Sequence, residues 1–218
     1  MIDLLPLYLS AKLALVTTAI LLVIGAALAY PLAFRRFNGK SLCEAFINLP
    51  LVLPPTVLGF FLLVLMGPRA AMGRAWQALF GSGLLFTFTA LVIASIIYSL
   101  PFAVQPMKTA FTRIDKRLIE NAYVLGLSPI STFFRVILPN SLGGIAAGAI
   151  LVFLHTLGEF GVILMVGGSV PGQTKVASIA IYEAVEALRY HDAWVLSALL
   201  IPTSYVFLLV SNKVFRSE

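Results

Sequence analysis

The sequence has 218 residues, of which 60% are hydrophobic and 11% are charged, and its formal net charge is +6. A soluble globular domain has about 25% charged residues and under half apolar residues, so the composition predicts an integral membrane protein. The single cysteine, Cys43, excludes an intrachain disulfide and any zinc or iron–sulfur site built from cysteines. Because the basic residues are interleaved with apolar spans, they indicate membrane topology and not nucleic-acid binding.

The first apolar run can be read in two ways. Lys12 before it and Ala27-Leu28-Ala29 within it fit a signal peptide with a cleavage site. The run nevertheless extends over residues 13–34, longer than a signal core of about 7 to 15 residues, and it ends at Arg35-Arg36. We therefore expect a first membrane-spanning helix.

Five apolar windows reach or approach the length of about 20 residues that a helix needs to cross a bilayer. They cover residues 13–34, 47–66, 84–104, 142–166 and 193–210. An odd number of spans places the termini on opposite sides, and no repeat or soluble segment interrupts the series. The sequence thus predicts an all-α integral membrane protein with five transmembrane helices, formed by one domain over residues 1–218.

The basic residues decide the orientation. With the N-terminus outside, ten lie on the cytoplasmic side: Arg35, Arg36, Lys40, Lys108, Arg113, Lys116, Arg117, Arg135, Lys213 and Arg216. Five lie outside: Lys12, Arg69, Arg74, Lys175 and Arg189. The positive-inside rule favours this arrangement, with the C-terminus in the cytoplasm. Two outer segments remain, residues 67–83 with Trp76 at the interface, and residues 171–192.

In the outer segment 171–192 we expect a short helix. Its apolar residues Ile181, Tyr182, Val185 and Leu188 fall on one helical face, whereas Glu183 and Glu186 turn away.

Two spans contain residues that disturb or tighten helix packing. In the second, Pro50, Pro54 and Pro55 remove backbone donors and Gly59 follows, which predicts a kinked or partly unwound helix. This break could line a pathway or be an ordinary proline kink in a packed bundle. The fourth span begins with Gly143 to Ala149, including a Gly144-xxx-Gly148 pair that favours close helix packing within or between subunits.

The polar segment 113–139 has a specific layout. From Asp115, apolar residues at Leu118, Ile119, Ala122 and Leu125 share a face and predict an amphipathic helix of about three turns. Gly126 stands where this helix needs a residue in the left-handed conformation to end it. Ser128 can then cap a second helix whose first residue is Pro129 and which ends before Pro139. Two short helices that meet at a glycine form a compact unit, which we call the knob. With the small Ala122 on its surface, the knob could enter a groove on a partner protein, or it could be a structured connector that binds no partner.

The spacing of Glu120-Asn121-Ala122, Gly126, Val136 and Leu138-Pro139 resembles the EAA loop of ABC importer permeases, the segment that docks on the ATPase subunit. The sequence departs at Asn121, usually Ala, and at Val136, often Ile. The stretches LPLVLPPTVLG at 49–59, LGEFG at 157–161, and MVGG and SVPGQT at 165–174 resemble the molybdate permease branch of that family. Tungstate and sulfate or thiosulfate permeases are near neighbours.

The resemblance implies a type I permease in a bacterial inner membrane, surrounded by lipid. The permease would be a homodimer, with two ATP-binding cassette subunits that bind ATP and Mg and hydrolyse the ATP, and with an extracytoplasmic oxyanion-binding protein that selects the substrate. This chain would itself hold no cofactor and would not be an enzyme. ATPase coupling would use Glu120, Asn121, Ala122, Gly126, Ser128, Pro129 and Pro139; pathway or gate candidates are Pro54, Pro55, Thr56, Gly59, Glu159, Phe160 and Gly161.

His155 and Glu159 stand four residues apart, a spacing that could hold a metal ion, but no second pair completes a site. No nucleophile elbow or phosphate-binding glycine loop is present in the sequence. Because a bare carboxylate would repel an anion, we expect Glu159 to be a hydrogen-bonded structural group near the outer end of its helix or at a dimer interface.

Two other classes of protein remain open. A stand-alone secondary transporter or channel should have coupling carboxylates within its spans, and Glu159 is the one candidate. A scaffold for another membrane complex would account for the apolar bulk but not for the glycine-punctuated loop.

Overall fold

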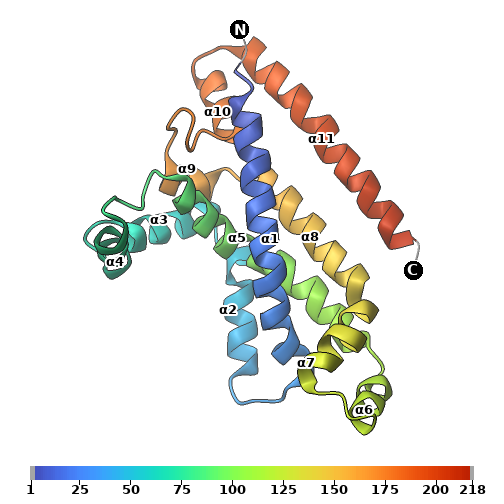
Figure 1. Ribbon diagram of the computed structural model, residues 1–218. Helices are drawn as coiled ribbons and strands as arrows, with labels where there is room; N and C mark the ends of the chain where they lie inside the picture. Colours follow the sequence, from blue (N-terminus) through green and yellow to red (C-terminus); the bar gives the residue numbers. More distant parts are fainter. Residues whose placement is uncertain (1–2, 217–218) are drawn as a thin grey trace.

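The computed structural model describes residues 3–216, and the side chains as far as Leu209 except that of Thr203. Within that range all regular elements are helices (Figure 1). Four are long and apolar enough to cross a membrane: α1 (Leu5–Phe34), α5 (Phe88–Arg113), α8 (Leu142–Leu157, with the short turn before it) and α11 (Tyr190–Arg216). The bent pair α2 (Lys40–Val52) and α3 (Pro55–Met66) makes a fifth span if counted as one. The side chains of Lys213 and Arg216, two of the expected cytoplasmic cations, lie outside the described part.

The centre of the bundle is formed by α1, α5 and α8, which pack against one another. The glycine pair of α8 is part of this contact. A Cβ on Gly144 would stand 2.3 Å from the Ala110 Cβ, and one on Gly148 would stand 3.2 Å from the Ala103 carbonyl oxygen. The expected close packing therefore occurs within the subunit, where it brings α8 against the backbone of α5.

The second span is broken, as its prolines predict. Helices α2 and α3 meet at 112° after Val52. Pro54 caps α3 and Pro55 is its first residue, positions at which the missing N–H is not needed by the helix. Pro50, by contrast, lies inside α2 without ending it.

The fourth window does not form one continuous span over residues 142–166. Helix α8 ends at Leu157, and a separate helix, α9 (Gly161–Gly167), follows. The N–H of Gly158 donates to the carbonyls of both Leu154 and His155, at 3.2 Å each, which closes the end of α8. The third span is also displaced, because it begins at Phe88, after the capping residue Thr87, and continues to Arg113.

Both outer segments contain a helix, α4 (Ala71–Phe80) and α10 (Ala177–Glu186). The short helix expected in the second segment is therefore present, but its large apolar residues are not the buried ones. Tyr182 and Val185 are exposed, as is Leu188 just after the helix, whereas Ile179, Ala180 and Ala184 are buried. This buried face lies where α10 packs against α11 and α1, and its alanines allow the helices to approach closely.

The polar segment forms the opposite end of the molecule from α10 (Figure 1). It contains α6 (Lys116–Val124), α7 (Pro129–Thr132), the π turn η1 (Phe133–Ile137) and the 3-10 turn η2 (Pro139–Ser141). The two expected short helices are therefore present. Pro139 begins η2, so the second helix stops before this proline, as its spacing predicts.

Candidate functional site

A cavity of about 570 Å³ lies where the two broken spans meet. Five of the predicted pathway residues line it together: Pro55, Thr56, Glu159, Phe160 and Gly161. Tyr98 of α5, Leu154 and His155 of α8, and Gly158, which caps α8, complete the lining. The tertiary structure thus brings the start of α3 next to the α8–α9 break, although more than a hundred residues separate them in the sequence.

Two predicted pathway residues are not in that lining. Pro54 is the residue that caps α3. Gly59 lies within α3, where a Cβ would meet the Cβ of Met165 at 2.9 Å. Its role is to let α3 approach α9 closely, which is a packing role.

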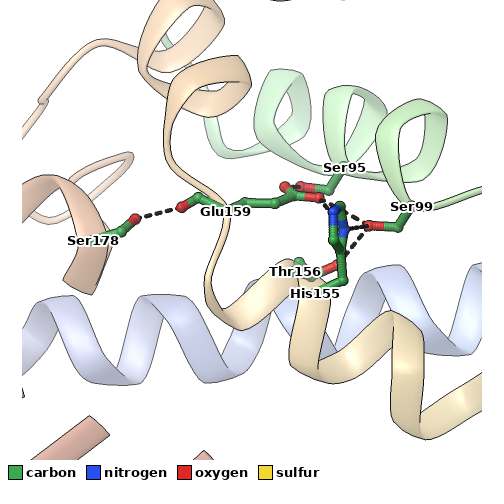
Figure 2. A network of polar contacts seen from close by, with 6 residues as sticks. All are labelled: Ser95, Ser99, His155, Thr156, Glu159 and Ser178. Carbon is green, nitrogen blue, oxygen red and sulfur yellow. Dashed lines mark hydrogen bonds and ion pairs between the residues drawn. The ribbon is translucent and has the colours of Figure 1, made fainter. Parts of the chain in front are cut away.

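Glu159 is held by a network of hydroxyl groups (Figure 2). Ser95 Oγ donates to Glu159 Oε2 at 2.5 Å, and Ser99 Oγ donates to Oε1 at 2.9 Å. Ser178 Oγ of α10 donates to the Glu159 backbone carbonyl at 2.5 Å. The carboxylate has no accessible surface and both of its oxygens accept a hydrogen bond, as a buried charged group requires. The expected hydrogen-bonded structural role is consistent with this arrangement, which lies within one subunit.

His155 stands beside this carboxylate, with Nδ1 at 3.4 Å from Glu159 Oε1 and 2.9 Å from Ser99 Oγ. Its ring stacks on Phe102 with centroids 4.2 Å apart and contacts Tyr98 at 4.6 Å. The imidazole is therefore fixed in place, and 21% of its side chain remains accessible.

The sequence patterns do not indicate Ser95, Ser99 or Thr156 as site residues. Ser99 Oγ also lies 3.1 Å from Thr156 Oγ1. The two serines stand four residues apart in an apolar span, so they share one helix face, and that spacing was the available signal. Among the described residues no group of three or more side chains is arranged to hold a metal ion.

Two polar contacts fasten α2 to α5 on the side of the cavity nearer the polar loop. Gln105 Nε2 donates to Asn48 Oδ1 at 2.7 Å, and Lys108 Nζ pairs with Glu44 Oε1 at 2.7 Å. All four side chains are partly buried. They give the face between α2 and α5 a polar character within an otherwise apolar bundle.

The turn between α6 and α7 has the geometry that its sequence predicts. Gly126 has φ +80°, the left-handed conformation that favours glycine. The N–H of Leu127 donates to the Ala122 carbonyl and that of Gly126 to the Tyr123 carbonyl, which is a Schellman ending. Ser128 Oγ then accepts from the Ser131 N–H at 3.2 Å, and Pro129 is the first residue of α7.

Ala122 is not on the surface of the knob, contrary to the prediction. It is 4% exposed, because α6 folds back on α7 and η1 and the small side chain lies inside that contact. The surface is instead formed by large apolar side chains, with Val124 86%, Leu125 78% and Ile130 73% exposed. A partner would therefore meet apolar side chains, not a gap left by a small residue.

Glu120 and Asn121 are exposed on α6. Glu120 lines a cavity of about 640 Å³ between the knob and the ends of α1 and α2. The cations of that lining are Arg35, Arg36, Lys40 and Lys116. This end of the molecule thus combines an apolar knob with a strongly basic recess.

Membrane-length helices, a bent helix pair and a cavity between two broken spans define a multi-pass α-helical membrane protein. Residues 11–215 match the family described as binding-protein-dependent transport system inner membrane component, and the chain belongs to that family. It is 45% identical over 217 residues to the molybdenum transport system permease protein ModB of Azotobacter vinelandii, covering 99% of this chain and 96% of that protein.

Other relatives extend the comparison. The putative molybdenum transport system permease protein YvgM of Bacillus subtilis (strain 168) is 34% identical, over 93% of this chain and 89% of that protein. The sulfate transport system permease protein CysT of Synechocystis is 30% identical, over 87% of this chain and 66% of that protein. Among solved structures, a bacterial ABC transporter involved in alginate import aligns with TM-score 0.75 and 17% identity, covering 96% of this chain and 79% of that one. The MetNI methionine transporter aligns with TM-score 0.73 and 16% identity, covering 97% and 94%; these likenesses show the fold.

Proposed function

We propose that this chain is the membrane permease subunit of an ATP-driven ABC importer for an oxyanion, and that the oxyanion is molybdate. The observation that carries the proposal is the 45% identity to a molybdenum permease along nearly the whole of both chains. Sulfate or thiosulfate and tungstate are the runner-up substrates, because a sulfate permease is also related at 30% identity.

The pathway in this proposal passes the cavity between α3, α5 and α8. The path needs a wall that does not repel an anion, and the Glu159 side chain has no surface in contact with the path, its two oxygens being occupied by the Ser95 and Ser99 hydroxyls. The polar contacts between α2 and α5 continue the polar surface toward the knob. Two copies of the chain would enclose the pathway, and the exposed apolar side chains of α2 and α3, such as Phe46, Val52 and Phe61, suit such a homodimer.

Coupling in this proposal uses the knob formed by α6, α7 and η1. Two ATPase subunits would bind the exposed Val124, Leu125 and Ile130 together with Glu120 and Asn121, and would hydrolyse ATP themselves. The knob packs on the bundle through buried Ile137 and Phe111, so a push on it moves α5 as a rigid body. The N-terminus and α10 would face outward, where an extracytoplasmic binding protein delivers the oxyanion, and the knob would face the cytoplasm of a bacterial cell.

Proteoliposomes test this function. The permease is reconstituted with its ATPase, and ATP is enclosed in the liposomes, where the ATPase subunits of the relevant complexes lie. The binding protein loaded with labelled molybdate is added outside. We expect molybdate uptake to require ATP, the ATPase and the binding protein. We also expect excess tungstate to reduce this uptake more than excess sulfate does. Molybdate uptake by the permease without any ATPase would contradict the proposal.

A stand-alone secondary transporter is the rival function. It needs an ionisable group that exchanges protons or ions during transport. Glu159 has both oxygens in hydrogen bonds and no accessible surface, which speaks against such a role.

A further inference from the structure

The cavity between the broken spans is lined by residues that can donate hydrogen bonds, whereas the carboxylate of Glu159 is not accessible from it. The hydroxyl-bearing residues Thr56 and Tyr98 line it together with His155. Glu159 lies in the same wall, but its side chain has no accessible surface, whereas 21% of the His155 side chain is accessible. An anion in this cavity therefore meets the imidazole before it meets the carboxylate.

The contacts of His155 leave one ring nitrogen unused. Nδ1 lies against Ser99 and Glu159, and the ring is stacked on Phe102 and Tyr98. Nε2 makes no hydrogen bond to any residue that the structure describes. The stacking and the Nδ1 contact hold the ring in one orientation, so Nε2 is preorganised for a ligand.

The proton count decides what Nε2 can offer. Ser99 has one hydroxyl proton and donates it to Glu159 Oε1, so the short contact with His155 is made by Nδ1–H donating to Ser99 Oγ. The second proton of an imidazolium is then on Nε2. In that form His155 balances the Glu159 charge on one side and donates a charge-assisted hydrogen bond to an oxyanion on the other.

We propose that His155 is a direct anion contact in the translocation pathway, with Nε2–H donating to the passing oxyanion and the hydroxyls of Thr56 and Tyr98 completing the contact. The inference rests on the proposed function and adds the residues that meet the substrate inside the membrane. Glu159 is the positioning residue, because together with Ser99 it holds the Nδ1 side of the ring. One hydrogen bond from a single side chain binds an anion weakly, which suits a pathway that must also release it.

The test separates substrate transfer from ATP hydrolysis. In proteoliposomes with saturating molybdate-loaded binding protein, His155→Gln is expected to lower molybdate uptake about tenfold, the effect of losing one charge-assisted hydrogen bond during transfer. ATP hydrolysis stimulated by the binding protein is expected to stay within about twofold, because the knob is far from this residue. His155→Lys, which also offers an N–H donor, is expected to restore uptake to within about threefold of the unsubstituted protein.

Thr56→Val and Thr18→Val form a matched pair of hydroxyl deletions. Thr56 lines the cavity, whereas Thr18 lies in α1 and its hydroxyl has no partner in the described part of the chain. Only Thr56→Val is expected to reduce uptake per ATP hydrolysed, by about threefold for one neutral hydrogen bond. Equal effects of the two substitutions would overturn the inference.

The chain's two histidines allow a direct measurement. Carbethoxylation of His155 and His191, which proceeds through the unprotonated fraction of each imidazole, is followed by mass spectrometry in the permease–ATPase complex, with and without molybdate. Protection of His155 and not of His191 is expected, and equal modification overturns the inference. Unchanged uptake in His155→Gln also overturns it while the importer function stands, whereas absence of ATP-driven molybdate uptake in the unsubstituted complex overturns both.

Discussion

The Glu159 network and the knob formed by α6, α7 and η1 are built in opposite ways. The network joins residues about 60 positions apart, from α5 and from the turn after α8, and it is buried. The knob is held by backbone and capping bonds between residues two to five positions apart, and it exposes large apolar side chains. The first is a device for holding a charge inside the bundle, and the second is a surface that a partner can bind.

This difference indicates where substitutions should act. A change in the network leaves a buried polar group without its partner, so the bundle itself loses stability. A change in the knob alters a surface, so association should suffer more than folding.

Glu159→Leu is expected to destabilise the bundle by about 3 kcal/mol, because it leaves two buried serine hydroxyls without their acceptor and removes the carboxylate beside His155 Nδ1. Thermal unfolding of the protein in nanodiscs measures the effect. Glu186→Leu is the matched control, since Glu186 is exposed on α10. A loss of stability as small as that of the control would contradict the structural role of the network.

Gly126→Val is expected to weaken binding of the ATPase about tenfold or more, while the bundle loses only about 1 to 2 kcal/mol from a β-branched residue at φ +80°. Co-purification with the ATPase and thermal unfolding are measured together. Gly83→Val is the control, because Gly83 has no positive φ and a Cβ there meets nothing within 4 Å. Intact association with Gly126→Val would instead favour a connector without a partner.

The outer segment gives the smallest effect. Burial would raise the pKa of Glu183, but the hydrogen bond and charge of Lys175 outweigh it and hold that pKa below the ordinary 4.5. A carboxyl with a lowered pKa stabilises the fold above its unfolded-state value, and this contribution is lost as pH falls through the lower folded-state value. The pair is partly exposed, so the loss should stay below about 1 kcal/mol.

Glu183→Gln tests that contribution. The stability difference between the unsubstituted protein and Glu183→Gln should be present at pH 7 and should vanish in acid below the folded-state pKa. A difference that persists unchanged in acid would show that Lys175 does not act through the Glu183 charge.

The sequence by itself determined the features that depend on composition and on near neighbours. Apolar length predicted the five spans, Pro54 and Pro55 predicted the break in the second, and Gly126, Ser128 and Pro129 predicted the turn of the knob. These features follow from backbone chemistry within a few residues, because a missing N–H or a left-handed turn has the same meaning in any fold.

Only the tertiary structure decided which residues meet. It ended α8 at Leu157, buried Ala122 and the small face of α10, and placed Ser95 and Ser99 against Glu159. No periodicity in one helix reveals the partner helix that faces it, because burial and hydrogen bonding are settled between segments far apart in the chain. For the same reason the sequence alone indicates that the Glu159 carboxylate would repel an anion. In the bundle that side chain is buried, and the partly accessible His155 lines the cavity.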